Sequence, residues 1–285
     1  MRALQFVRAL MVVAGLGACV PFAQAQTVED RTQDKVAFPA HKMIGNIYYV
    51  GTGTLNSFLI TSPQGHILIN TNFEDTIPLL KQSIEGLGFK LTDVKVVLGS
   101  HAHGDHMQAD GSVKALTGGA QVMVMEQDVP AVKNMMVANA PHPIDRVLTD
   151  GDTVVLGGTT LTAHYTPGHT RGCTTWTMKV VDGGKPLDVV IACGGLQDGA
   201  RLVNNKNYPE IADDFALSVK KYRALPVDVF LASHSWFWDL AGKHAKLGGA
   251  TNPYIDPAGY ARWVDSMERD LTTMLAEQRK NPPTN

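Results

Sequence analysis

The 285-residue chain lacks several features that mark particular classes of protein. It has no block of like charges, and its 25 basic and 27 acidic side chains leave a formal net charge of −2. This excludes the basic stripes that bind nucleic acid and the basic helices that bind anionic membranes. No linker of low complexity divides the chain. We expect an ordinary globular protein that can bury a sizeable core and binds no nucleic acid.

The chain also lacks an apolar run long enough to span a bilayer. The longest one, residues 9–20, is too short, but it follows Arg2 and Arg8 and precedes Ala-Gln-Ala at 23–25. This order is typical of a signal peptide that is cleaved to leave Gln26 as the mature N-terminus.

The same segment supports a second interpretation. Residues 16–19, Leu-Gly-Ala-Cys, resemble a bacterial lipobox, which would make Cys19 a lipid-anchored N-terminus. Both interpretations export the protein, so we expect it in the periplasm, with an outer-membrane lipoprotein as the alternative. The expected division is a signal peptide over residues 1–25, an N-terminal arm over 26–43 and one domain over 44–285.

Short apolar runs separated by glycine, proline and polar residues predict many strands. We expect them at 47–50, 57–60, 66–69, 94–98, 121–125, 153–156, 160–164, 174–181, 188–192 and 227–232. Helical patterns cover 76–87, 108–116, 208–222 and 257–278. Turns at Gly157-Gly158 and at 182–184 predict two hairpins. The pattern favours one domain with two similar β-rich halves and helices outside.

The strongest chemical signal follows the strand expected at 94–98. Three histidines and one aspartate lie within six residues, and Gly104 permits the tight turn that brings such side chains together. These residues are His101, His103, Asp105 and His106. Imidazole and carboxylate are preferred zinc ligands, so this spacing indicates a metal site rather than a polar surface loop.

Two more histidines, His169 and His234, come directly after expected strands. If these strands run parallel, their carboxyl ends share one edge, and all three histidine-bearing loops meet at one cleft. The other five histidines are interpreted as loop, strand or helix-surface residues. His142 lies between two prolines, and nothing in the sequence pattern requires it to lie near the cleft.

Together these motifs resemble the metallo-β-lactamase superfamily. The resemblance rests on His-x-His-x-Asp-His at 101–106, Thr-Pro-Gly-His-Thr at 166–170 and the strand-end His234. Segments 46–51, 162–176 and 252–254 are further similar to class B, subclass 3 β-lactamases.

The resemblance implies an α/β fold, a four-layer αββα sandwich, with two zinc ions in its edge cleft. The first zinc would be held by His101, His103 and His169, and the second by Asp105, His106 and His234. The implied function is hydrolysis of the amide bond of penicillins, cephalosporins and carbapenems by a metal-bound hydroxide, which would confer antibiotic resistance. Asp105 would hold the second metal and orient the hydroxide. A site charge of about +2 would attract an anionic β-lactam, and we expect a monomer.

One departure from the subclass concerns the substrate carboxylate. Where many members place two serines, this chain has Gly194 and Leu196. Recognition then falls to another group, and the nearest candidates are Arg201, Asn204, Asn205 and Lys206, each of which has the alternative interpretation of a residue on the loop surface. Residues 131–143, expected at the cleft rim, also form a shorter segment than in many members of the subclass.

Other members of the superfamily offer rival functions. Glyoxalase II, acyl-homoserine lactonases and phosphodiesterases place a metal-bridging aspartate after the strand that here ends near Cys193. No carboxylate occupies that place. The alternative that is not an enzyme is a non-catalytic zinc-binding protein.

Cys173 and Cys193 lie at equal distances in sequence from Gly183, in the turn of the second hairpin. They should therefore face each other across the strands, close enough for a disulfide. The alternative is a pair of buried free thiols.

Overall fold

The structure, a computed structural model, describes residues 31–137 and 140–283. The expected signal peptide, its cleavage site and Cys19 lie outside these residues. The last residues of the arm expected over 26–43 lie in a strand. After the 3-10 helix η1 (Arg31–Gln33), residues 41–43 already belong to strand β1 (His41–Ile44), so the domain begins before residue 44. Only two of its four residues, Met43 and Ile44, are apolar, so its sequence pattern is weak, and its hydrogen bonds come from pairing with its neighbour.

Two β-sheets form the centre of the molecule. The first has the order β1-β2-β3-β4-β5-β6-β9, and the second the order β10-β11-β12-β13-β14. The further strands of the first sheet are β2 (Ile47–Tyr49), β3 (Phe58–Ser62), β4 (Gly65–Ile69), β5 (Val94–Leu98), β6 (Gln121–Met125) and β9 (Arg146–Leu148). Those of the second are β10 (Thr153–Leu156), β11 (Thr159–Tyr165), β12 (Thr174–Asp182), β13 (Lys185–Ala192) and β14 (Val229–Ala232). A small hairpin pairs β7 (Met136–Val137) with β8 (Ala140–Pro141).

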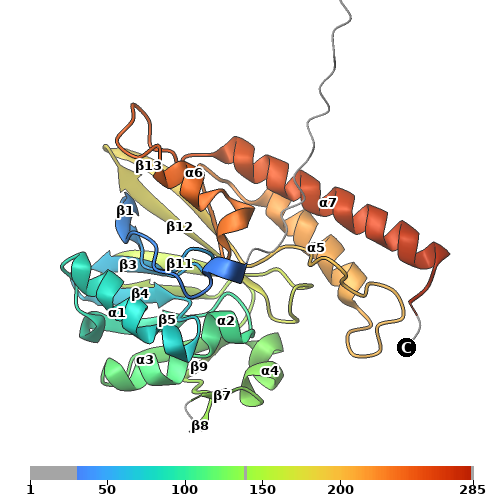
Figure 1. Ribbon diagram of the computed structural model, residues 1–285, viewed down its shortest axis with the longest axis horizontal. Helices are drawn as coiled ribbons and strands as arrows, with labels where there is room; N and C mark the ends of the chain where they lie inside the picture. The colour runs from blue at the N-terminus through green and yellow to red at the C-terminus, as the bar shows by residue number, and fades with distance from the viewer. Residues whose placement is uncertain (1–30, 138–139, 284–285) are drawn as a thin grey trace, which may run out of the picture.

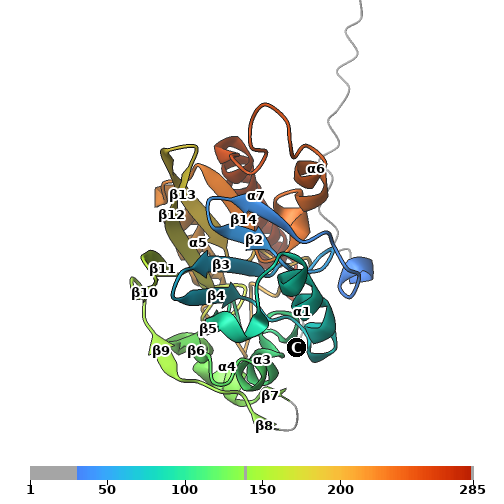
Figure 2. The ribbon, with the colours of Figure 1, turned by 90° about the vertical axis from the view of Figure 1, so that its left-hand side faces the viewer.

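Helices cover the outer faces of both sheets, as Figures 1 and 2 show. On the side of the first sheet lie α1 (Ile77–Gly86), α2 (Gly104–Met107), α3 (Asp110–Leu116) and α4 (Val129–Lys133). On the side of the second lie α5 (Ile211–Ala224), α6 (Leu240–His244) and the long α7 (Pro257–Lys280). Short 3-10 helices are η2 (Glu74–Thr76), η3 (Leu91–Asp93), η4 (Glu126–Asp128) and η5 (Ser235–Phe237). The αββα sandwich is confirmed.

The alternation of side chains along β3 explains why two faces are buried at once. Phe58 and Ile60 belong to the large core cluster that includes Trp176 of the second sheet. Leu59, between them, belongs to the cluster that includes Leu80 of α1. Because successive side chains point to opposite faces, a continuous apolar run supplies both interfaces of a covered sheet.

The ten strands expected from the sequence are present, three with the expected bounds and the others with shifts of up to three residues at their ends. The helix expected at 108–116 is present as α3, which begins two residues later than expected. The short helix α2, which contains Asp105 and His106, precedes it and was not expected. Strands β1 and β9 and the helices α4 and α6 were not expected. Among the described residues, no helix combines the length and the apolar character needed to cross a membrane.

The register of the second hairpin differs from the prediction by one residue. Asp182 pairs with Lys185, so the turn is the two-residue Gly183-Gly184 and is not centred on Gly183. Both glycines have positive φ angles, which a type I′ turn requires. The two cysteines are therefore offset by one place across the hairpin and are not directly opposed.

Candidate metal centre

The first group of predicted ligands comes from both sheets. His101 and His103 lie between β5 and α2, and His169 follows β11. Their ring centroids are 4.3–5.0 Å apart. One ligand nitrogen of each residue lies within 4.8 Å of those of the other two.

The second group is more tightly drawn together. Nε2 of His106 lies 3.1 Å from Nε2 of His234. Oδ2 of Asp105 lies 3.7 Å from the first of these nitrogens and 3.8 Å from the second. Ligands at about 2.0–2.1 Å from a tetrahedral zinc stand about 3.3 Å apart. The three atoms thus have the spacing of donors that share one ion.

The two groups adjoin each other. The rings of His101 and His106 have centroids 4.1 Å apart, and a ligand atom of Asp105 lies within 4.8 Å of ligand atoms of both. The six residues therefore form one cluster of candidate metal ligands.

The protonation of the cluster suits metal binding. His101 is 2% exposed, and burial, together with the nearby imidazoles, lowers its pKa well below the usual value. Burial, with His103 as the next cause, lowers the pKa of His169 to about 3. Nε2 of His101 and of His169 are buried with no hydrogen-bond partner among the described residues. Neutral imidazole nitrogens without partners are the donors that zinc requires.

Comparison with known proteins also identifies a family of metal-dependent enzymes. Residues 50–181 match the family described as the metallo-beta-lactamase superfamily. The native FEZ-1 metallo-beta-lactamase from Legionella gormanii is 42% identical to this chain, which covers 98% of it, with 86% of this chain aligned and a TM-score of 0.82. The chain belongs to the metallo-β-lactamase superfamily.

Within the superfamily, the structural neighbours belong to subclass B3. The class B3 di-zinc metallo-beta-lactamase LRA-12 from an Alaskan soil metagenome is 30% identical, with a TM-score of 0.78 over 86% of this chain and 97% of that one. A hydroxyacylglutathione hydrolase from Fuscovulum blasticum is 34% identical over 98 residues, 34% of this chain and 33% of that protein. The chain spans about a third of the length of the curated relatives it matches.

The histidine-bearing loops meet at one cleft, as predicted, but the strands before them belong to two sheets. Strands β11 and β14 belong to one sheet and run in the same direction, as expected, because two antiparallel pairings and one parallel pairing separate them. Strand β5 belongs to the other sheet. The cleft therefore lies along an edge that both sheets share, where the amide of Thr174 donates to the carbonyl of Ser100 at 2.7 Å.

Asp128, which the sequence analysis missed, joins two of the ligand loops. Its Oδ2 accepts from the amide of Ala102 and from the hydroxyl of Thr170, each at 2.8 Å. Its Oδ1 accepts from the amide of Gly172 at 2.6 Å. A Cβ at Gly172 would lie 2.6 Å from Cγ of Asp128, so only glycine permits this approach. A lone acid at the start of α4 gave no spacing signal.

The loop after β13 and η5 supports the remaining imidazoles. The carbonyl of Gly195 lies 2.9 Å from Nδ1 of His169, which directs Nε2 toward the cluster. The indole of Trp236 stacks on the ring of His234, with centroids 4.1 Å apart and an interplanar angle of 13°. The sequence analysis also missed these two contacts, since neither residue type identifies them.

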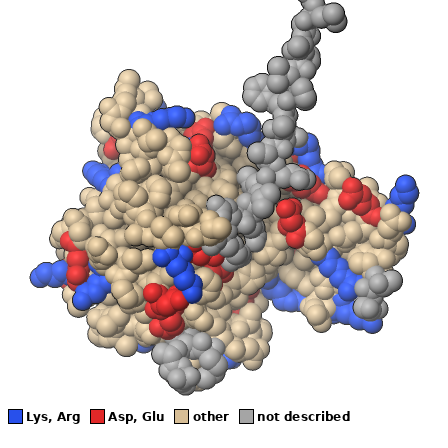
Figure 3. Space-filling model, in the orientation of Figure 1, with Lys and Arg blue, Asp and Glu red and all other residues tan. Residues whose placement is uncertain are grey.

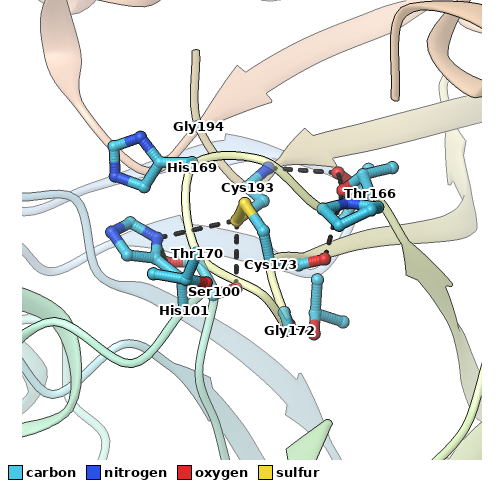
Figure 4. The surroundings of a disulfide bond; sticks show 12 residues. Ser100, His101, Thr166, His169, Thr170, Gly172, Cys173, Cys193 and Gly194 are labelled. Atoms are coloured by element: carbon cyan, nitrogen blue, oxygen red, sulfur yellow. Dashed lines mark hydrogen bonds between the residues drawn. A yellow bond between two sulfur atoms is a disulfide. The ribbon is translucent and has the colours of Figure 1, made fainter. Parts of the chain in front are cut away.

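Cys173 and Cys193 form a disulfide beside the cluster, which confirms that prediction (Figure 4). Their Cα atoms are 5.7 Å apart, within the ordinary range despite the shifted register. Sγ of Cys193 lies 3.6 Å from Nδ1 of His101. Because both sulfurs are in the bridge, neither is a thiolate ligand.

The structure separates the predicted substrate residues. Gly194 packs on His169, and a Cβ at Gly194 would lie 3.0 Å from Cγ of the imidazole ring. Leu196, two residues later, is half-buried. Arg201 donates from Nη2 to the carbonyl of Pro283 at 2.8 Å. The other candidates, Asn204, Asn205 and Lys206, line a surface cavity of about 450 Å³ with Pro209. His142 pairs with buried Asp110 at 3.0 Å.

Proposed function

We propose that this protein is a zinc-dependent β-lactamase that hydrolyses the amide bond of β-lactam antibiotics. The observation that carries the proposal is the convergence of six donors into two adjacent groups of three. The chain is also 42% identical to a solved β-lactamase, of which it covers 98%. His101, His103 and His169 would hold one ion, and Asp105, His106 and His234 the other.

When bound, the two zinc ions supply Lewis acidity and lower the pKa of a water molecule. The protein supplies the positions. Gly195 and the disulfide fix the rings of His169 and His101, and Trp236 fixes that of His234. We assign to Asp105 the orientation of the attacking water, because it is the carboxylate of the ligand set.

Two rival functions are weaker. Lactonases and thioesterases of the superfamily use a metal-bridging aspartate after the strand that corresponds to β13. Here Cys193 follows that strand and is held in a disulfide. A non-catalytic zinc protein has no need of two adjacent ion sites that share a cleft. The disulfide also supports our proposal that the protein works outside the reducing cytoplasm.

The deciding experiment is hydrolysis of a chromogenic cephalosporin by metal-loaded and chelator-treated protein, with zinc content measured in the same samples. We expect turnover with zinc, loss on chelation, recovery on zinc addition and no effect of serine-directed inhibitors. Penicillin and carbapenem turnover should follow. Hydrolysis of a glutathione thioester or a homoserine lactone without β-lactam turnover would favour the rivals.

A further inference from the structure

A second cavity, next to the ligand cluster, lies between η5, α6 and the first turns of α7. Its volume is about 640 Å³. Figure 1 shows α6 beside the beginning of α7. The proposed metal ligands are not among its lining residues, so β-lactam hydrolysis gives this cavity no role.

The walls of the cavity are aromatic. Five of its lining residues have aromatic rings: Phe230, Trp236, Phe237, Trp238 and Trp263. Three of the four tryptophans of the chain are in this set. Flat rings offer large apolar contact at low entropic cost, and they favour a flat aromatic body between them.

The polar groups of the cavity favour an anion. Lys243, Lys246 and Arg262 line it, against Asp239 and Asp256. Asp239 caps α6, and Asp256 caps α7 and pairs with both Lys243 and Arg262. Three cationic groups against two carboxylates leave one positive charge in excess at the cavity.

Lys243 is the anchor of this charge. It is 6% exposed, and its Nζ lies 5.8 Å from the ring centre of Phe230 and 5.7 Å from that of Trp238. Its ion-pair partner is Asp256, at 3.0 Å. An ammonium group has three donors, so one carboxylate oxygen leaves capacity for a further acceptor.

Trp238 adds an independent indication. The side chain is 3% exposed, and its indole N–H is buried with no acceptor among the described residues. A buried donor without an acceptor is costly, and an acceptor supplied by a ligand in the cavity would remove that cost.

We propose that this cavity is a binding site for small aromatic carboxylates, in which the aromatic body lies among the tryptophans and the carboxylate meets Lys243 and Arg262. None of the six proposed ligands lines this site, so the proposal does not rest on the proposed hydrolytic function, although Trp236 contacts both the cavity and His234.

The test uses 2-naphthoate as the probe, with metal-loaded and chelator-treated protein, by isothermal titration calorimetry. We expect saturable one-to-one binding of similar affinity in both samples. The uncharged 2-naphthalenemethanol should bind at least tenfold more weakly, because it cannot pair with the cations. Binding that disappears on chelation would place the carboxylate at the metals and overturn the proposal, as would the absence of saturable binding.

Two variants locate the site. Lys243→Gln should weaken 2-naphthoate binding about tenfold, the effect of one lost charge-assisted hydrogen bond. Arg262→Gln, at a side chain 73% exposed, should weaken it several-fold without a risk to folding. Lys179→Gln removes a lysine of the β12–β13 hairpin that does not line the cavity and is the matched control, with unchanged affinity expected. Unchanged affinity in Arg262→Gln together with Lys243→Gln would refute the site.

Discussion

At the scale of single residues, the proposed ligands depend on neighbours that a ligand motif does not reveal. The carboxylate of Asp128 connects the loop of His101 and His103 to that of His169 through three hydrogen bonds. All three of its partners are donors. Burial raises the pKa of Asp128, and these hydrogen bonds oppose that rise by stabilising the charged form.

Asp128→Asn tests this support. The substitution places an NH₂ group against donors, so one loop must move. We expect zinc affinity at the first group to fall about 10–100-fold, the usual effect of losing an outer hydrogen-bond partner of a metal site. Competition with a chromophoric chelator measures the affinity, and turnover should fall in parallel.

The control is Glu210→Gln. Glu210 forms an exposed ion pair with Arg171, whose loop also carries His169. Exposed pairs contribute little, so zinc affinity should not change. Equal zinc affinity in Asp128→Asn and in the native protein would show that the loops hold their positions without this carboxylate.

At the scale of elements, the spacing of residues in the β12–β13 hairpin predicted its strands and its cysteine pair but not its register. The apolar runs and the Gly183-Gly184 turn identified both strands, and the two cysteines were correctly paired. The register was wrong by one because a turn of two glycines and a turn centred on one glycine leave nearly the same pattern in sequence. The offset pair can still be joined because both cysteines lie just beyond the strand ends.

Replacing both cysteines by serine tests the role of the disulfide. A closed loop of this length stabilises a protein by about 3 kcal/mol, mainly by restricting the unfolded chain. We expect the free energy of unfolding in urea to fall by about that amount while two zinc ions remain bound. Loss of one zinc from the Cys173→Ser/Cys193→Ser protein would mean that the sulfurs contribute to the metal centre.

The start of α7 gives a second prediction for an element. Asp256 accepts from the amide of Gly259 as the helix cap and pairs with buried Lys243. Asp256→Ala removes both interactions, whereas Asp256→Asn keeps a capping oxygen. We expect Ala to be less stable than Asn by about 1 kcal/mol in urea unfolding. Equal stability of the two variants would assign the whole effect to the ion pair.

At the scale of the whole molecule, the local patterns predicted more than the long-range ones. Apolar runs predicted the strands, and the spacing of histidines and aspartate predicted residues that the fold brings together. Strand β1 was not predicted because only two of its four residues are apolar, and β9 because it has only three residues. The roles of Asp128 and Trp236 arise from contacts between distant segments, which one sequence does not encode in any local spacing. On the face in Figure 3, side chains of both signs are scattered among uncharged residues.

The same division between core and cleft predicts how the molecule responds to metal removal. The core lies between the sheets and beneath the outer helices, whereas the six proposed ligands lie at the cleft, in α2 or in loops that follow strands. The fold should therefore survive without zinc. Far-ultraviolet circular dichroism at 25 °C should be the same before and after chelation.

Stability, however, should fall on chelation, because zinc binds the folded cleft and brings its clustered donors together. An ion present at 100 times its dissociation constant stabilises the folded state by about 2.7 kcal/mol, and two ions act at separate donor groups. The thermal midpoint should therefore drop by several degrees on chelation and return when zinc is added. The Asp105→Ala protein, which lacks one donor of the second group, should show a smaller drop than the native protein. An unchanged midpoint in native protein that has demonstrably lost its zinc would contradict the ligand assignment, and unfolding at 25 °C would contradict the independence of the core.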